Sequence, residues 1–199
     1  MKCAILVVGV GGQGVLLASR VLGDAAMRSG QEVVMSEVHG MAQRGGSVSS
    51  MVRFGAGVIS PLIETAGADV ILAFEPSEAC RALSYAHKGT TIITDTNPIL
   101  PAGAIRGDEV YPPVDTILDA ISSSGVRLIA IDSVGEAEKA GSRLAANAVL
   151  LGALARTGAS SLAAEMIRAS LVENVKEKHR EMNGRAFDAG LSATRSAKR

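Results

Sequence analysis

Six residues near the N-terminus have the types and spacing to bind an anion. The stretch Gly9-Val10-Gly11-Gly12-Gln13-Gly14 matches G-x-G-x-x-G, between an apolar run and a helical pattern. Glycine at position 9 permits a tight turn, Gly11 lets a ligand approach the backbone, and Gly14 lets the helix pack closely on the strand. The helix would direct unpaired N–H groups and its positive dipole end at the loop. Gly9, Gly11, Gly12, Gln13 and Gly14 are therefore the predicted cofactor-binding residues.

The glycine loop alone leaves three interpretations open. It could bind NAD(P), since Glu37 follows Gly14 by 23 positions and could contact a ribose hydroxyl. It could bind another anion, or it could be a turn with a purely structural role. It is not a Walker A loop, because Val15 stands where that motif has lysine. No thiamine diphosphate motif is found either, since Gly107-Asp108-Glu109 lacks the third glycine and a preceding strand.

A second polar segment, residues 37–46, is predicted to form a loop at the carboxyl end of the next predicted strand. Its sequence is Glu37-Val38-His39-Gly40-Met41-Ala42-Gln43-Arg44-Gly45-Gly46. Arg44 could pair bidentately with a carboxylate or phosphate, and His39 could titrate near neutral pH. A subunit interface, a ligand contact and internal packing, with Glu37 paired to Arg44, all remain open. The predicted substrate-contact or interface residues are Glu37, His39, Gln43, Arg44, Gly45 and Gly46.

Composition excludes several classes of protein. The chain has 199 residues, with 20 basic and 20 acidic side chains, so no net charge attracts it to nucleic acid. Its two cysteines, Cys3 and Cys80, are too few for a [4Fe–4S] cluster or a four-cysteine zinc site, and both are expected to be buried free thiols. No apolar stretch approaches the roughly 20 residues that span a bilayer. We therefore expect a cytoplasmic protein with no metal site and no catalytic residue of its own.

Buried strands alternate with helices along the chain, and this order predicts the fold. Strands are expected at residues 3–8, 32–36, 47–54, 69–74, 90–94 and 126–131. Helices are expected at 12–29, 75–87, 115–123, 133–156, 160–172 and 174–189, with His87 exposed at the end of the second and the proline-rich residues 98–113 irregular. The alternation predicts an α/β fold with a doubly wound, mostly parallel, Rossmann-like sheet and a helical C-terminal extension. Residues 1–190 would form one domain, and residues 191–199 a disordered basic tail.

Together, the two polar segments resemble the gamma domain of the 2-oxoacid:ferredoxin oxidoreductases. Gly9–Ala18 matches a loop common to that superfamily, whereas Ser36–Val48 resembles the small (beta) subunits of the indolepyruvate ferredoxin oxidoreductase branch. The pyruvate and 2-oxoglutarate branches carry a different, proline-containing loop there. The resemblance covers residues 1–190, with 98–125 matching only loosely. Further similarity lies in Ser60-Pro61-Leu62-Ile63, Phe74-Glu75-Pro76, Glu181-Met182-Asn183 and Ala186-Phe187-Asp188-Ala189-Gly190.

This resemblance implies a subunit of a multi-subunit enzyme. Such enzymes decarboxylate a 2-oxoacid on thiamine diphosphate, pass electrons through [4Fe–4S] clusters to ferredoxin, and form acyl-coenzyme A. The thiamine diphosphate and clusters would lie on the large (alpha) subunit, so this chain would hold neither, would not be catalytic alone, and would lie beside the substrate and coenzyme A. Indolepyruvate, phenylpyruvate and 4-hydroxyphenylpyruvate are the implied substrates.

Two other functions remain as alternatives. The chain could be a free-standing NAD(P)-dependent reductase that uses the same glycine loop, or a module that binds a nucleotide or coenzyme A. Whether the isolated chain forms a homodimer is also open.

Overall fold

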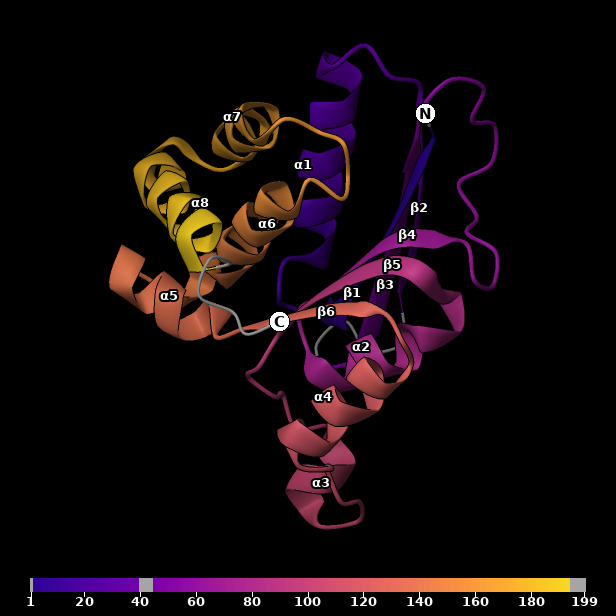
Figure 1. Ribbon diagram of the computed structural model, residues 1–199. Coiled ribbons are helices and arrows are strands. Elements are labelled where there is room, and N and C mark those ends of the chain that lie inside the picture. The colour runs from indigo at the N-terminus through magenta and orange to yellow at the C-terminus, as the bar shows by residue number, and fades with distance from the viewer. Residues whose placement is uncertain (1, 40–44, 194–199) are drawn as a thin grey trace.

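The computed structural model describes residues 2–39 and 45–193, and Figure 1 shows their arrangement. In these ranges six strands form one sheet in the order β2-β3-β1-β4-β5-β6. Strands β1, β4, β5 and β6 pair in parallel, whereas β3 is antiparallel to both β2 and β1. The predicted mostly parallel α/β sheet is confirmed. The strands are β1 (Cys3–Val10), β2 (Val33–His39), β3 (Ser47–Phe54), β4 (Ala68–Ala73), β5 (Ala86–Asp95) and β6 (Arg127–Ile131).

Helices cover both faces of the sheet. In Figure 1, α1, α6, α7 and α8 lie together on one side, and α2 and α4 lie on the other. The α-helices of the described residues are α1 (Val15–Arg28), α2 (Pro76–Arg81), α3 (Ala102–Arg106), α4 (Val114–Ser123), α5 (Ser133–Ala140), α6 (Ala146–Thr157), α7 (Ala164–Asn174) and α8 (Arg180–Ala193). Short 3₁₀ turns are η1 (Ala82–Tyr85), η2 (Arg143–Ala145) and η3 (Glu177–His179). The C-terminal helices are therefore part of the layer that begins with α1.

Strand β1 lies at the centre of the core, because its side chains point alternately to the two helical layers. Ile5 and Val7 belong to the larger apolar cluster, with α1 and α6, whereas Leu6 and Val8 belong to the cluster with α2 and α4. All eight residues of β1 are buried. An unbroken apolar run is what a strand covered on both faces requires.

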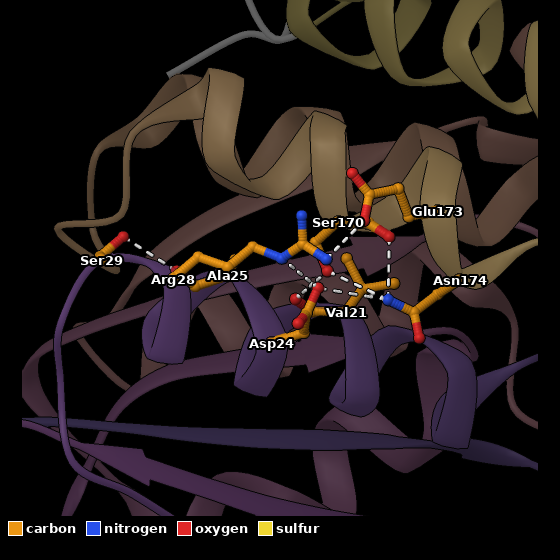
Figure 2. A network of polar contacts seen from close by, with 8 residues as sticks. All are labelled: Val21, Asp24, Ala25, Arg28, Ser29, Ser170, Glu173 and Asn174. Atoms are coloured by element: carbon orange, nitrogen blue, oxygen red, sulfur yellow. Dashed lines mark hydrogen bonds and ion pairs between the residues drawn. The ribbon is translucent and has the colours of Figure 1, made fainter.

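A polar network joins α1 to α7 at the edge of the larger layer (Figure 2). Arg28 of α1 pairs with Asp24 at 2.8 Å, between Nε and Oδ2, and with Glu173 of α7 at 2.5 Å, between Nη2 and Oε2. The buried Ser170 hydroxyl of α7 donates to the Val21 carbonyl oxygen at 2.9 Å. These contacts set α7 against α1 in addition to the apolar packing beneath them.

Three predictions about the elements are wrong in detail. The helix expected at 75–87 ends at Arg81, and His87, which is exposed as predicted, lies in β5, where the pairing with β4 shifts register between the Ala68–Ala86 and Val70–Thr91 partners. The helix expected at 133–156 is two helices, separated where Gly141 takes a φ of +121° and Ser142 caps the following turn. Residues 98–113 contain the short helix α3.

The expectations for the first strand–helix–strand unit, for the two cysteines and for the C-terminal end of the domain can also be compared with the structure. Strands β1 and β2 run in the same direction, as the predicted strand–helix–strand unit requires, but β3 lies between them. Cys3 is buried as predicted, and burial raises the pKa of its thiol to about 12, whereas Cys80 is only half-buried. Helix α8 continues to Ala193, past residue 190, and the division into a domain and a tail stays a prediction. Among the described residues, no helix is long and apolar enough to cross a membrane.

Candidate functional site

The glycine loop joins the carboxyl end of β1 to the start of α1. It lies beside the end of β4, and the helices that follow β1 and β4 cover opposite faces of the sheet. Ligands of open α/β sheets gather at such a switch in the winding direction. Gly14 is the N-cap of α1 in the left-handed region, with a φ of +88° and no side-chain cap. The structure therefore puts the predicted loop at the sheet edge where it could meet a ligand.

Gln13 crosses the crevice between β1 and β4. Its Oε1 accepts a hydrogen bond from the Val10 N–H at 2.7 Å, and its Nε2 donates to the Phe74 carbonyl oxygen at 2.6 Å. This also explains the first glycine, since a Cβ at Gly9 would lie 2.9 Å from Gln13 Oε1 and 3.0 Å from the Phe74 Cβ. The side chain predicted to touch a ligand is thus engaged in fixing the loop.

Two backbone N–H groups of the glycine loop also make hydrogen bonds within the chain. The Gly11 N–H donates to the Gly46 carbonyl oxygen at 2.9 Å, and the Gln13 N–H donates to the Val10 carbonyl oxygen at 3.1 Å. Within the described ranges, the N–H groups of Gly12 and Gly14 make no hydrogen bond. An anion at this loop would therefore meet the N–H groups of Gly12, Gly14 and the first turn of α1.

Gly14 has a different role from the predicted one. The prediction was close packing of the helix on the strand, but a Cβ at this position would overlap the Asn147 side-chain amide of α6. Gly12 takes a φ of +105° with open space around it. The loop is therefore shaped by a helix more than 130 residues further along the chain, which no local pattern reveals.

The second polar segment reaches the glycine loop through its last residues. The bond from Gly11 to the Gly46 carbonyl brings the two predicted segments together, and Gly45 takes a φ of +78° in open space. The loop prediction is wrong for residues 37–39, because cross-strand pairing with β3 extends β2 to His39. Glu37 is exposed in β2, opposite Ser50 of β3. Gln43 and Arg44 lie outside the described residues, and so does any pairing of Arg44 with Glu37. The roles predicted for all six residues stay predictions.

Two hollows flank the glycine loop. The first, which we call the loop hollow, has a volume of about 300 Å³ and lies against the start of α1, with Leu16 and Val48 in its wall. The second, the β5-side cleft, has a volume of about 200 Å³ and lies against the ends of β4 and β5 and the starts of α5 and α6. Gly12 lines both. The β5-side cleft is lined by Gly12, Gln13, Phe74, Asp95, Ile99, Ser133, Val134, Arg143, Leu144, Ala146, Asn147 and Leu150.

The polar residues of the β5-side cleft are not among the predicted site residues. Asp95 ends β5 and is 3% exposed, and its Oδ1 accepts hydrogen bonds from Asn97 Nδ2 at 2.9 Å and the Ser133 N–H at 3.1 Å. Asn97 Nδ2 also donates to Asp132 Oδ1 at 2.8 Å, just after β6. Burial raises the pKa of Asp95, against the opposing effect of these hydrogen bonds. Acidic residues directly after two neighbouring buried strands were the sequence signal that could have revealed this group.

A buried carboxylate ties residues 98–113 to the end of β4. Glu75 is fully buried and caps α2 by accepting from the Glu78 N–H at 3.0 Å. It also accepts hydrogen bonds from the hydroxyls of Tyr111 and Ser77 and, at 3.4 Å, from the Ile99 N–H. Burial and the neighbouring Glu75 carboxylate raise the pKa of Tyr111. This group holds one wall of the β5-side cleft, because Ile99 lines that cleft.

The described residues contain no group of three or more histidine, cysteine, aspartate or glutamate side chains that could hold a metal ion.

Comparison with known proteins now identifies the family. Residues 4–193 match the family model "Pyruvate ferredoxin/flavodoxin oxidoreductase". The chain belongs to this family. It is similar to the indolepyruvate oxidoreductase subunit IorB of Archaeoglobus fulgidus, with 41% identity over 96% of this chain and 95% of that protein. The predicted resemblance to the indolepyruvate branch is thereby confirmed, and the chain is a subunit of an oxidoreductase of this family.

Solved structures support the fold. The gamma subunit of a keto/oxoacid ferredoxin oxidoreductase from Geobacter sulfurreducens superposes with a TM-score of 0.72 and 24% identity, covering 98% of this chain and 99% of that one. The 2-oxoglutarate:ferredoxin oxidoreductase from Magnetococcus marinus, solved with 2-oxoglutarate, coenzyme A and succinyl-CoA bound, superposes with a TM-score of 0.70 and 22% identity. This chain covers only 32% of that longer one. The same fold therefore occurs both as a separate subunit and as one part of a larger chain.

Proposed function

We propose that the chain is the small subunit of an indolepyruvate-type 2-oxoacid:ferredoxin oxidoreductase. The enzyme would convert aryl 2-oxoacids such as indolepyruvate to acyl-coenzyme A and carbon dioxide, and would reduce ferredoxin in the cytoplasm. The observation that carries the proposal is the 41% identity to the Archaeoglobus subunit over nearly the whole length of both chains. The contact between Gly11 and Gly46 adds to it, because it joins the superfamily loop and the branch-specific segment at one sheet edge.

In this proposal the redox cofactors belong to a large partner subunit. Thiamine diphosphate there would supply the decarboxylation chemistry, and [4Fe–4S] clusters would carry the electrons. This chain would complete the assembly and contribute a surface beside the substrate and coenzyme A. The segment 37–46 is its proposed contact with the large subunit or with the anionic groups of the substrate.

We further propose that the loop hollow contacts an anionic part of coenzyme A. The N–H groups of Gly12 and Gly14, which make no hydrogen bond within the described residues, border that hollow, as does the positive end of α1. The free-standing NAD(P) reductase is the weaker alternative on physical grounds. Gln13 spans the crevice in which a dinucleotide would lie, and the Gly11 N–H that would face a pyrophosphate already donates to Gly46.

Co-purification tests the proposal directly. The tagged chain, isolated from its native host, should bring with it a large subunit that contains thiamine diphosphate and iron. The complex should reduce ferredoxin with indolepyruvate and coenzyme A, while the separated small chain should not. Isolation of the chain alone, with NADH or NADPH binding by titration, would instead favour the reductase.

A further inference from the structure

One buried polar side chain of the β5-side cleft has no hydrogen-bond partner of normal geometry among the described residues. Ser133, the first residue of α5, is fully buried and lines the cleft, and its hydroxyl lies beside the Asp95 carboxylate. Within the described ranges, that hydroxyl makes no hydrogen bond of normal geometry. Leaving a buried polar atom unsatisfied costs about 1–3 kcal/mol. The Ser133 hydroxyl is therefore a hydrogen-bond donor in the wall of the cleft that a ligand could use.

Two more unused donors border the same cleft. Asn147, in the first turn of α6, is 7% exposed, and its Oδ1 accepts from the Ala148 N–H at 2.8 Å. Its Nδ2 donates no hydrogen bond to any described residue, and it occupies the space that a side chain at position 14 would need. Arg143 lines the cleft from η2 with an exposed guanidinium, which pairs with no carboxylate in the described part of the chain.

Two helices begin around the cleft, and carboxylates already cap one of them, since the Ser133 N–H donates to Asp95 and the Gly135 N–H donates to Asp132. Helices α5 and α6 begin at the cleft, with Ser133 and Val134 at the start of one and Ala146 and Asn147 at the start of the other. At the start of α6 the Ala146 N–H donates to the Arg143 carbonyl oxygen, and the Ala148 N–H donates to Asn147 Oδ1. Partial positive charge at helix N-termini favours an anion.

The Asp95 carboxylate in the wall of the cleft limits which anions could bind there. The hydrogen bonds of normal geometry that Asp95 accepts both go to Oδ1, from Asn97 and from the Ser133 N–H. A fully deprotonated anion such as sulfate would be repelled by this carboxylate and could offer it no proton. A phosphate that retains one O–H can donate to the carboxylate while its other oxygens accept from the surrounding donors.

We propose that the β5-side cleft is a phosphate subsite, in which Arg143, Asn147 and Ser133 donate to the phosphate oxygens and Asp95 accepts the phosphate O–H. Its volume of about 200 Å³ suits one such group, because pockets for whole drug-sized ligands measure roughly 300–1,000 Å³. The subsite is separate from the loop hollow, and it goes beyond the proposed function. If the subsite proves absent, the assignment as a small subunit remains intact.

The test uses the full chain with inorganic phosphate and, in parallel, sulfate at the same ionic strength. Wild type should show a rise in Tm with phosphate and a smaller one with sulfate. Arg143→Gln should weaken phosphate binding by about ten- to a hundredfold, the effect of losing a hydrogen bond to a charged group. Arg156→Gln, an exposed arginine at the other end of α6, is the matched control and should bind as wild type does.

Two further variants separate the subsite from a structural effect. Ser133→Ala should weaken phosphate binding yet leave the Tm without phosphate equal to that of wild type or higher, because it removes a buried hydroxyl that has no partner. Asp95→Asn should bind sulfate as well as phosphate, because an amide can donate where the carboxylate cannot. Both results would support the subsite.

Three outcomes would overturn it. The first is equal binding of phosphate and sulfate by wild type, and the second is the same phosphate affinity in Arg143→Gln as in Arg156→Gln. The third is a loss of phosphate binding in Leu16→Glu while Arg143→Gln retains it, since Leu16 lines the loop hollow and not the cleft. In that case the anion would belong to the glycine loop.

Discussion

At the scale of single residues, the glycine loop shows how one side chain can decide what a motif does. The spacing of its glycines is that of a dinucleotide loop. Gln13 nevertheless satisfies the Val10 N–H and the Phe74 carbonyl, and Gly11 is bonded to Gly46. The sequence could predict where the loop lies, because the apolar run and helical pattern around it are local. It could not predict these partners, because Phe74 and Gly46 reach the loop through the sheet.

Replacing Gln13 tests whether that side chain holds the loop in place. Gln13→Leu would leave the Val10 N–H and the Phe74 carbonyl without their partner and should lower the free energy of unfolding by about 1–3 kcal/mol. Urea denaturation of the isolated chain measures this difference. Gln31→Leu, at an exposed position, is the control and should change little. Equal stability of the two variants would contradict the role assigned to Gln13.

At the scale of elements, the buried strands were predictable, whereas the helix breaks were not. Strand β1 is apolar throughout because both of its faces are covered, and that pattern is visible in the sequence. The break between α5 and α6 depends on Gly141 adopting a positive φ, which a helical pattern of small residues conceals. The packing of α6 on α8 depends on glycines whose partners lie more than 30 residues away.

Alanine substitutions of two glycines in α8 test how closely α6 and α8 pack. A Cβ at Gly190 would overlap the Val149 carbonyl, whereas one at Gly184 would meet only the flexible Arg168 guanidinium, 3.0 Å away. Alanine in a helix normally gains about 1 kcal/mol over glycine. Gly190→Ala should instead destabilise the chain by about 1–3 kcal/mol through overpacking, while Gly184→Ala should be neutral or slightly stabilising. Chemical denaturation distinguishes them, and a more stable Gly190→Ala would show that the helices do not approach so closely.

The contact between α1 and α7 should depend on pH (Figure 2). Although partial burial raises the pKa of Asp24, the Ser170 hydroxyl and the Arg28 guanidinium outweigh it and hold that pKa below its ordinary value. Arg28 likewise lowers the pKa of Glu173. A carboxyl whose pKa is lower in the folded state stabilises the fold above its unfolded pKa, about 4, and this contribution is lost as the pH falls through the folded pKa.

The variant Arg28→Gln tests whether this stabilisation is lost as the pH falls. Its Tm should lie below that of wild type at pH 7, and the gap should narrow as the pH falls below about 4, where both carboxyls become protonated. Thermal unfolding across a pH series measures the gap. Lys139→Gln is the control, because it removes a pair with Glu136 on the exposed face of α5 and leaves the contact between helices intact. A gap that widens with acidity would contradict the network.

At the scale of the whole molecule, the sheet gathers its chemical groups at one edge. The glycine loop, the end of segment 37–46 and the β5-side cleft all lie at or beside the carboxyl ends of β1, β4 and β5. None of the predicted site residues that the structure describes lies at the opposite edge. A partner that shares a substrate with this chain would therefore approach this edge. The proposed interface and the proposed ligand contacts would then lie on the same surface.

Arg44, which lies outside the described residues, is the sharpest probe of the proposed role of segment 37–46. If it contacts a carboxylate of the large subunit, or an anionic group of the substrate or coenzyme A, no neutral side chain can replace its planar, doubly donating guanidinium. Removing one partner of such a buried pair costs about 2–5 kcal/mol, which is roughly 30-fold or more in the affected constant. Arg44→Ala should therefore weaken assembly or turnover by that factor, while the Tm of the isolated chain changes little. Reconstitution with the large subunit, followed by gel filtration and dye reduction, measures both, with Arg156→Ala as the control. Unchanged assembly and turnover would exclude a functional role for Arg44, whereas a large fall in the Tm of the isolated chain would indicate internal packing instead.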